Sequence, residues 1–511
     1  MTTIQRNSFI QALHEMNVPQ VIQTTTANGA LSNLLVDPSL THEGLVGLFY
    51  KCCRGIEDDM LYLYLDKLME ENMHDAILLA FYTRDCRGGK GERDIGRKCF
   101  QYIAQNIHGV EQLRLTLPLI PKYGRWDDLV VLSTNKDLSE TIFALIRDRL
   151  DQDLHLRDQG VPTSMCAKWL PSEGLALDSK TKFVERFCSY ANLTKATYRK
   201  KYLTPLRRHI DIVENRICKG QWDTIDFSRV PSCAMMKLSD AFLKHTPEKF
   251  EEWKDSLASG KTTVNAAQLF PHEVVHQYMK DGLTTINPLY EAQWGVLLEK
   301  IGSIRNSLSV CDVSLSMTSE LPKSKCTCLT VAMSISIMLS QKCSDVFRGK
   351  VITFSQSPSF VELDVVETLV EKIKLLKKAD WGANTNFQSV FDLILRTIVS
   401  NDVSVDDIPQ RLFVLSDMQF DEADGSTNFE AIRNKFNTLG ITMPQLIFWN
   451  ISGSSTDFPV TLHENGTLLI SGFSPTILKY IFELDELTPL TIARHVLDSE
   501  RYTEVRALLE N

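Results

Sequence analysis

The chain has 511 residues, of which 43% are hydrophobic and 23% charged, and its formal net charge is −9. At roughly 100–200 residues per domain, this composition fits a globular protein of several domains and excludes disordered, collagen-like and fibrous chains. No apolar run reaches the ~18 residues of a membrane helix, and the N-terminus lacks a signal region. Twelve scattered cysteines without a C-x-x-C pair favour free thiols in a reducing compartment. We therefore expect a cytoplasmic protein without a membrane segment.

Residues 1–300 are predicted to form helix after helix. Apolar residues recur at helical spacing, as at Ile95, Cys99 and Ile103. Short turns with glycine or proline separate the helical segments, and strand-like alternation is scarce. Such a chain fits antiparallel helix pairs stacked as HEAT-like repeats.

The pattern changes near residue 306, where short apolar runs begin to alternate with helical segments. Strands are expected at 308–312, 350–354, 411–417, 445–449 and 467–470, and helices at 325–340, 365–377, 387–399 and 429–439. This alternation predicts a doubly wound, mostly parallel sheet. The expected fold is therefore an all-α helical-repeat domain over 1–300, an α/β domain over 301–485, and a helical extension over 486–511 that packs back on the body.

Polar side chains follow two of these strands and precede one helix. Asp312, Ser314 and Ser316 come after the first strand, Thr385 lies in a loop before a helix, and Asp417 ends a later strand. In an open α/β sheet, ligand sites lie beyond the carboxyl ends of the strands. Hydroxyl and carboxylate oxygens suit Mg²⁺ or another hard divalent cation. The sequence therefore predicts a metal site made of these five residues.

The order D-x-S-x-S, then threonine, then aspartate resembles the metal-ion-dependent adhesion site (MIDAS) of von Willebrand factor A domains. The resemblance implies that Ser314, Ser316 and Thr385 bind the metal directly, and that Asp312 and Asp417 act directly or through water.

In such domains the open coordination position accepts a carboxylate from a partner, so the resemblance implies a docking point for an acidic protein. No evident base or nucleophile accompanies it, and we expect no enzymatic activity. The sequence departs from the family pattern at Leu315, where glycine is usual and is the residue that adapts most freely to a sharp turn.

A glycine-rich turn over 83–93 carries four basic residues. Backbone N–H groups at a helix start, with arginines beside them, favour phosphate. The alternative is a structural helix cap whose arginines pair with the neighbouring carboxylates. The candidate nucleic-acid contacts in this turn are Arg84, Arg87, Lys90 and Arg93.

This turn and the segment 123–129, followed by an A-type domain, resemble the TROVE-module proteins, the family of the Ro ribonucleoprotein autoantigen. More closely, the chain resembles a TROVE-like family of unknown function, with further matches at 166–171, 222–227 and 230–232. The resemblance implies a ring of helical repeats closed by the A domain. It further implies binding of structured small RNAs outside the ring and of single-stranded RNA ends in its hole.

Residues 195–219 contain eight lysines and arginines against two acidic residues, with Tyr198 and Tyr202 interleaved. Aromatic residues among basic ones suit phosphate contact and base stacking. A solvated helix face with a packing surface is the alternative. The candidate contacts here are Arg199, Lys200, Lys201, Arg207 and Arg208.

Two further motifs imitate enzyme signatures. The segment 272–276 reads H-E-V-V-H, the zinc protease pattern, but Pro271 before it is typical of an ordinary helix start. The segment 255–262 imitates a phosphate-binding loop, but it lacks the first glycine and follows a helix instead of a strand. Both enzyme readings are therefore disfavoured.

Two hypotheses remain. The first is a non-enzymatic RNA-binding scaffold with a metal-dependent docking site. The alternative is a protein-interaction or structural module that recruits an acidic partner through the metal and does not bind RNA.

Overall fold

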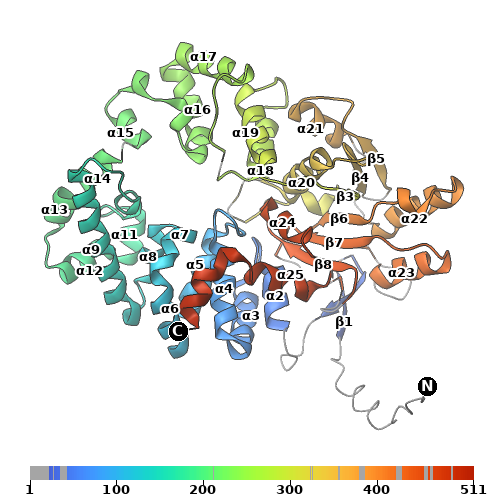
Figure 1. Cartoon of the computed structure of the whole chain (residues 1–511), viewed down its shortest axis with the longest axis horizontal. Helices are drawn as coiled ribbons and strands as arrows, with labels where there is room; N and C mark the ends of the chain where they lie inside the picture. Colours follow the sequence, from blue (N-terminus) through green and yellow to red (C-terminus); the bar gives the residue numbers. More distant parts are fainter. Residues whose placement is uncertain are drawn as a thin grey trace, which may run out of the picture.

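The computed structural model describes residues 22–26, 28–34, 43–210, 212–266, 268–322, 324, 326–354, 357–378, 386–421, 428–453, 459–460, 464–484 and 487–510. Helices form an arch, and a domain built on a six-stranded sheet lies between the two ends of that arch (Figure 1). The predicted fold class, a helical part followed by an α/β domain, is confirmed. Among the described residues, no helix combines the length and apolar character needed to cross a membrane.

The arch is built from amphipathic helices that bury one face each. In α5, for example, Ile95, Cys99 and Ile103 of the predicted stripe are buried. The helices of the arch are α2 (Glu43–Lys51), α3 (Asp58–Glu71), α4 (Met73–Arg84), α5 (Arg93–Ile103), α6 (Ile107–Thr116), α7 (Ile120–Tyr123), α8 (Trp126–Leu132), α9 (Lys136–Asp158), α10 (Cys166–Trp169), α11 (Ala176–Thr181), α12 (Phe183–Ala191), α13 (Lys195–Thr197), α14 (Thr204–His209), α15 (Val213–Cys218), α16 (Ser232–His245), α17 (Pro247–Ala258), α18 (Pro271–Lys280) and α19 (Pro288–Glu299).

The sheet has the strand order β5-β4-β3-β6-β7-β8. All neighbours are parallel except β4 and β5, which are antiparallel. Because successive strands run outward in both directions from the centre, the order reverses between β3 and β6, and this is the place where open α/β sheets bind ligands. The strands are β3 (Ser307–Asp312), β4 (Lys350–Phe354), β5 (Ser359–Glu362), β6 (Arg411–Ser416), β7 (Gln445–Asn450) and β8 (Thr467–Ser471).

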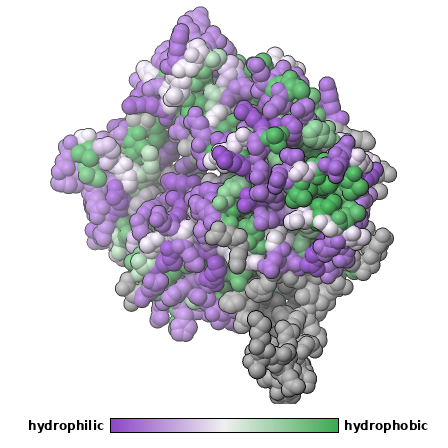
Figure 2. Space-filling model, turned by 45° about the vertical axis from the view of Figure 1, so that its right-hand side comes forward, coloured by the Kyte–Doolittle hydropathy of each residue, from purple (hydrophilic) through white to green (hydrophobic). Residues whose placement is uncertain are grey.

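Helices pack against this sheet, and the central strand β3 is buried along its whole length. The helices of this part are α20 (Cys328–Lys342), α21 (Leu369–Lys377), α22 (Phe387–Ser400), α23 (Asn428–Thr438), α24 (Leu478–Ile481), α25 (Pro489–Leu497) and α26 (Thr503–Leu509). In the view of Figure 2, hydrophilic residues cover most of the surface, and the largest hydrophobic patch lies on the side of the sheet domain.

The sequence did not predict three strands. The edge strand β5 is short and only half buried, so it lacks the continuous apolar run that marks the other strands. The hairpin of β1 (Ile22–Thr25) and β2 (Leu31–Leu34) depends on a distant contact. At its turn, the Thr26 hydroxyl donates to the Phe420 carbonyl at 2.6 Å and accepts the Ala30 N–H at 3.0 Å.

The end of the chain returns to the first helices of the arch. Helices α25 and α26 pack on α4, and α26 also contacts α6, while β8 contacts α2. Arg494 of α25 forms an ion pair with the buried Asp75 of α4. The Gly453 N–H, beyond β7, donates to the Arg54 carbonyl at 2.8 Å. The sheet domain is therefore held by the beginning of the arch as well as by its end (Figure 1).

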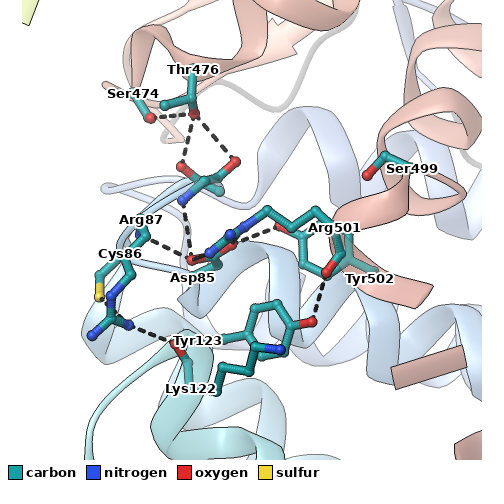
Figure 3. A network of polar contacts seen from close by, with 12 residues as sticks. Asp85, Cys86, Arg87, Lys122, Tyr123, Ser474, Thr476, Ser499, Arg501 and Tyr502 are labelled. Atoms are coloured by element: carbon teal, nitrogen blue, oxygen red, sulfur yellow. Dashed lines mark hydrogen bonds and ion pairs between the residues drawn. The ribbon is translucent and has the colours of Figure 1, made fainter. Parts of the chain in front are cut away.

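Asp85, in the turn between α4 and α5, is the centre of this closure (Figure 3). Its carboxylate is completely buried and accepts hydrogen bonds from Arg501 Nη2 at 2.8 Å and from the Tyr502 hydroxyl at 3.2 Å. The same carboxylate accepts the N–H groups of Arg87 at 2.9 Å and Gly88 at 3.1 Å. We call this group, made of Asp85, Arg501, Tyr502 and the two N–H donors, the Asp85 clasp. It ties the predicted phosphate-binding turn to the 3₁₀ helix η8 (Glu500–Tyr502), which leads into α26.

Candidate metal cluster and basic concavity

Four of the five predicted metal ligands lie in one cluster at the reversal of strand order. The Ser416 hydroxyl, at the end of β6, donates to Asp312 Oδ2 at 2.6 Å, which links the ends of β6 and β3. The Ser314 N–H donates to Asp312 Oδ1 at 2.9 Å, and the hydroxyls of Ser314 and Ser316 share a hydrogen bond of 3.1 Å. Ser316 also hydrogen-bonds Asp417. The predicted ligand Thr385 lies outside the described residues.

A strained turn orients Asp417. Met418, which follows it, has a φ of +65°, a left-handed conformation that is unfavourable for a side chain of this size. Its N–H donates to the Ser416 hydroxyl at 2.9 Å, which holds the turn. Ser416 thus links Asp312 to the turn that carries Asp417, a role that sequence reasoning did not assign to it.

The two carboxylates of the cluster are buried and close to each other. Burial and the neighbouring Asp417 carboxylate together raise the pKa of Asp312 to about 7. Burial likewise raises the pKa of Asp417. Two carboxylates and two or three hydroxyls form a hard oxygen donor set, which fits Mg²⁺ or a similar cation. No group of three or more His, Cys, Asp or Glu side chains suited to a metal occurs among the described residues.

Leu315 does not fill the cluster. Its side chain is 63% exposed, whereas Ser314 before it is completely buried. The residue begins the right-handed 3₁₀ turn 315–318, so its backbone does not need the freedom of glycine. Leucine in place of the usual glycine at position 315 therefore does not keep the oxygen-bearing side chains of the cluster apart.

A second feature is a concavity on the inner side of the arch, which we call the basic concavity. It consists of three adjoining cavities of about 510, 390 and 290 Å³. Arg125 and Gln268 line both the first and the second cavity, and Lys168 and Pro231 line both the second and the third. Among the described residues that line it, nine are basic and four acidic: Arg54, Arg84, Arg87, Arg93, Lys98, Arg125, Lys168, Arg216 and Arg229, against Glu92, Asp94, Asp226 and Glu273.

The middle of the basic concavity combines cations with indole rings. The Arg125 guanidinium lies 4.3 Å from the centroid of the Trp169 ring, and Lys168 Nζ lies 5.6 Å from it. Trp126 lines the same cavity. Sequence reasoning missed these residues as contacts. A signal was present, because a basic residue directly precedes tryptophan both at 125–126 and at 168–169.

The four basic residues predicted in the 83–93 turn separate into two pairs. Arg87 and Arg93 line the basic concavity with exposed side chains. Arg84, which also lines it, and Lys90 are buried and hold the fold. Arg84 Nε lies 2.9 Å from Asp128 Oδ2, and Lys90 Nζ donates to the Cys52 carbonyl at 3.1 Å and to Ser471 Oγ at 2.7 Å. Burial lowers the pKa of Lys90. The alternative, in which the arginines pair with Asp85, Glu92 and Asp94, describes Arg93, whose Nε lies 3.7 Å from Asp94 Oδ1. It does not describe Arg84 or Lys90, whose partners lie elsewhere in the chain.

The basic segment 195–219 is similarly divided. Tyr198 and Tyr202 are buried, so neither ring offers a surface on which a base can stack. Arg207 donates to the carbonyls of Ala167 at 2.9 Å and Leu170 at 2.7 Å, which fixes it in the packing of α10 on α14. Helical periodicity alone did not separate these packed positions from the solvated ones. The exposed members of the predicted set are Arg199, Lys200, Lys201 and Arg208.

The H-E-V-V-H segment is the start of α18. His272 is buried between the rings of Phe270 and Phe473, with centroids 5.6 and 5.2 Å away. Glu273 accepts the Phe270 N–H at 2.9 Å and thus caps the helix. The segment 255–262 is a helix end, since Gly260 has a φ of +68° and the Lys261 N–H donates to the Ser256 carbonyl. Both motifs are structural.

The burial of His272 predicts an acid-sensitive fold. Burial, with Arg54 and His276 nearby, lowers its pKa from 6.5 to about 3. Below pH 6.5 the unfolded chain therefore binds a proton that the folded chain does not. The free energy of unfolding therefore decreases as the pH is lowered. Between pH 6.5 and 5 this one group is expected to reduce the free energy of unfolding by about 1.6 kcal/mol. His272→Phe, measured by urea unfolding at both pH values, should lose that part of the pH dependence. His108→Gln, at an exposed position, should keep it, and an unchanged slope in His272→Phe would contradict the assignment.

An arch of helices joined at both ends to a doubly wound α/β domain, with an oxygen cluster at the reversal of its strand order, defines the class of this protein. Residues 185–305 match a domain of unknown function, DUF2828, and residues 306–504 match another, DUF7788. The chain is 31% identical over 471 residues to "Uncharacterized protein L728" of Acanthamoeba polyphaga mimivirus, covering 84% of this chain and 80% of that protein. The chain belongs to the family of that mimivirus protein. It is also similar to the crystal structure of the Ro (RSR) protein of Deinococcus radiodurans, with a TM-score of 0.44 and 11% identity over 89% of this chain and 99% of that one.

Proposed function

We propose that this protein is a non-enzymatic RNA-binding scaffold whose binding face is the basic concavity. The observation that carries the proposal is the charge contrast: nine basic side chains against four acidic ones line this surface, although the whole chain has a net charge of −9. A polyanion is the ligand class that such a surface attracts.

The arrangement of side chains favours single-stranded over double-stranded RNA. Trp126 and Trp169 supply rings for base stacking beside Arg125 and Lys168, which supply positive charge for the phosphates. Stacking requires bases that are free of a duplex. The sequence resemblance to the TROVE-like family supports the same ligand class.

Filter binding of a single-stranded RNA across a salt series tests the proposal. If the full chain contacts about five phosphates, the logarithm of the binding constant should fall with the logarithm of salt concentration with a slope near −3.5. A double-stranded RNA of the same sequence should bind at least about tenfold more weakly, because its bases are not free to stack. No binding at low salt, or binding independent of salt, would reject the proposal.

The oxygen cluster supports a second activity of the same scaffold, metal-dependent docking of an acidic protein. Asp312, Ser314, Ser316 and Asp417 would hold the cation, and a bound cation supplies an open position for a partner's carboxylate. The same activity without RNA binding is the alternative function. The four residues offer oxygens alone, so the cluster suits binding better than proton transfer.

Manganese binding by the purified full chain, followed by electron paramagnetic resonance, tests the docking site. Asp417→Asn should abolish binding of the ion, and it should fold because it removes one of two adjacent buried carboxylates. Asp406→Asn, at an exposed position of the same domain, is the matched control and should bind manganese normally. Equal binding by both variants would remove the metal from the proposal.

A further inference from the structure

The N-terminal hairpin, formed by β1, β2 and the turn between them, lies against the segment that directly follows Asp417. We call residues 416–421 the Asp417 turn. Residues 419, 420 and 421 of this turn each have a partner in the hairpin, and each contact is made to their backbone. The three contacts are Asn28 Nδ2 donating to the Gln419 carbonyl at 2.9 Å, the Thr26 hydroxyl donating to the Phe420 carbonyl at 2.6 Å, and an antiparallel bridge between Gly29 and Asp421.

The tip of the hairpin is ordered by its own hydrogen bonds. The Thr26 N–H donates to the Ala30 carbonyl at 2.8 Å, and the Thr26 hydroxyl accepts the Ala30 N–H at 3.0 Å. A hydroxyl that accepts one hydrogen bond can still donate another, here to Phe420. Thr26 and Ala30 are buried, and so are Met418 and Phe420 of the Asp417 turn. The space left between these four residues is only about 10 Å³, so the hairpin packs closely on the turn.

Gln419 joins the hairpin to the carboxylate of Asp417. Its N–H donates to Asp417 Oδ1 at 3.3 Å, while its carbonyl accepts from Asn28. The residue between them, Met418, has a left-handed backbone that is unfavourable for its side chain, and such a conformation persists only where surrounding contacts hold it. The hairpin supplies contacts of this kind from 391 and 394 positions away in the chain.

A second connection runs through the side chain of Phe420. Its ring is stacked on that of Phe387, with centroids 4.5 Å apart, and both rings are buried. Phe387 is the first residue of α22 and follows the predicted ligand Thr385 by two positions. By holding Phe420, the hairpin therefore also supports the start of α22.

We propose that the N-terminal hairpin is a positioning element of the metal site, in which Thr26 and Asn28 hold the Asp417 turn so that the Asp417 carboxylate stays beside Ser316. The inference rests on the metal-dependent docking site of the proposed function and adds that a segment outside the α/β domain sets its affinity for the cation. A carboxylate that is already fixed loses less freedom when the ion binds, so the ion binds more tightly.

Manganese titrations of the full chain, followed by electron paramagnetic resonance, test the hairpin. Asn28→Ala changes an exposed residue, and it should weaken manganese binding about threefold. Adding Thr26→Val, which keeps the shape of the side chain but removes the hydroxyl, should bring the loss to about tenfold. Thr26→Ser keeps the donor and should bind manganese as the wild type does.

The matched control is Thr116→Val. It removes another buried hydroxyl, which donates to the Leu113 carbonyl at 3.1 Å in α6 of the arch. Its midpoint of thermal unfolding should fall about as far as that of Thr26→Val, but its manganese affinity should not change. An equal loss of affinity in both variants would assign the effect to general stability and overturn the inference.

Hydrogen exchange of the metal-free chain tests the hairpin independently of the ion. The N–H groups of Met418 and Gln419 are bonded to Ser416 Oγ and Asp417 Oδ1, and they should exchange about tenfold faster in the double variant at 26 and 28. Equal manganese affinity in this variant and the wild type overturns the inference while the docking site stands. If the wild type binds no manganese, the docking site fails, and the exchange rates alone decide whether the hairpin holds the Asp417 turn.

Discussion

Asp85→Ala is expected to lower the midpoint of thermal unfolding by roughly 5–10 °C and to make the C-terminal helices susceptible to limited proteolysis. The change removes the fully buried acceptor of Arg501, of the Tyr502 hydroxyl and of the Arg87 and Gly88 N–H groups. Removing one partner of a buried ion pair costs about 3–5 kcal/mol, because the other charge is left unpaired. Calorimetry and mass spectrometry of the proteolytic fragments measure the two effects.

The matched control for this prediction is Lys122→Ala. Lys122 pairs with Glu504 of α26 at 2.6 Å, so it joins the same parts of the chain, but both side chains are more than half exposed. An exposed pair contributes little, and the control should unfold like the wild type. If Asp85→Ala unfolds like Lys122→Ala, the Asp85 clasp does not hold the C-terminal helix on the arch.

The double substitution Arg125→Glu and Lys168→Glu is expected to weaken binding of single-stranded RNA by about 100-fold at low salt. It removes two positive charges from the middle of the basic concavity and puts negative charges beside Trp169. The salt dependence should also become shallower by about 1.4 units of slope, the contribution of two phosphate contacts to a single strand. Filter binding at several salt concentrations measures both quantities.

Arg199→Glu with Lys200→Glu is the matched control, because it makes the same change in charge at two exposed residues of η2 (Tyr198–Leu203). Figure 1 shows the helices on either side of it, α13 and α14, at the outer edge of the arch. We expect this control to bind RNA within about threefold of the wild type. A larger loss in the control than in the double substitution at 125 and 168 would move the binding face to the outer segment.

Local sequence patterns were sufficient to predict every strand of the sheet except β5. The predicted strand 350–354 coincides with β4, and 411–417 differs from β6 by one residue, because buried parallel strands are continuous apolar runs. The position of the oxygen-bearing side chains at one edge of the sheet could also be predicted from the sequence, because Asp312 and Ser416 end adjacent parallel strands. The edge strand β5, half buried, has no such run.

The residues that line the basic concavity could not be predicted from local sequence patterns. Among the predicted contacts, the 83–93 turn contributed the exposed side chains of Arg87 and Arg93. Arg84, which also lines the first cavity, and Lys90 have the same residue types but are buried. In the sequence, a basic side chain that faces solvent has the same charge and spacing as one that is buried against a carbonyl group. Arg125 and Lys168, 43 positions apart in the chain, join the same surface only because α8 and α10 pack together.

The amino-acid sequence by itself determined the succession of helices and strands and the oxygen-bearing residues at the ends of β3 and β6. Periodicity and strand direction are local properties, and a parallel sheet brings its carboxyl ends to one edge. Only the tertiary structure decided that Arg501 and Tyr502 close on Asp85, which basic residues are buried, and which line the concavity. Those outcomes depend on contacts between residues that are tens to hundreds of positions apart, where burial decides whether a charge forms an ion pair inside the protein or remains available to a ligand.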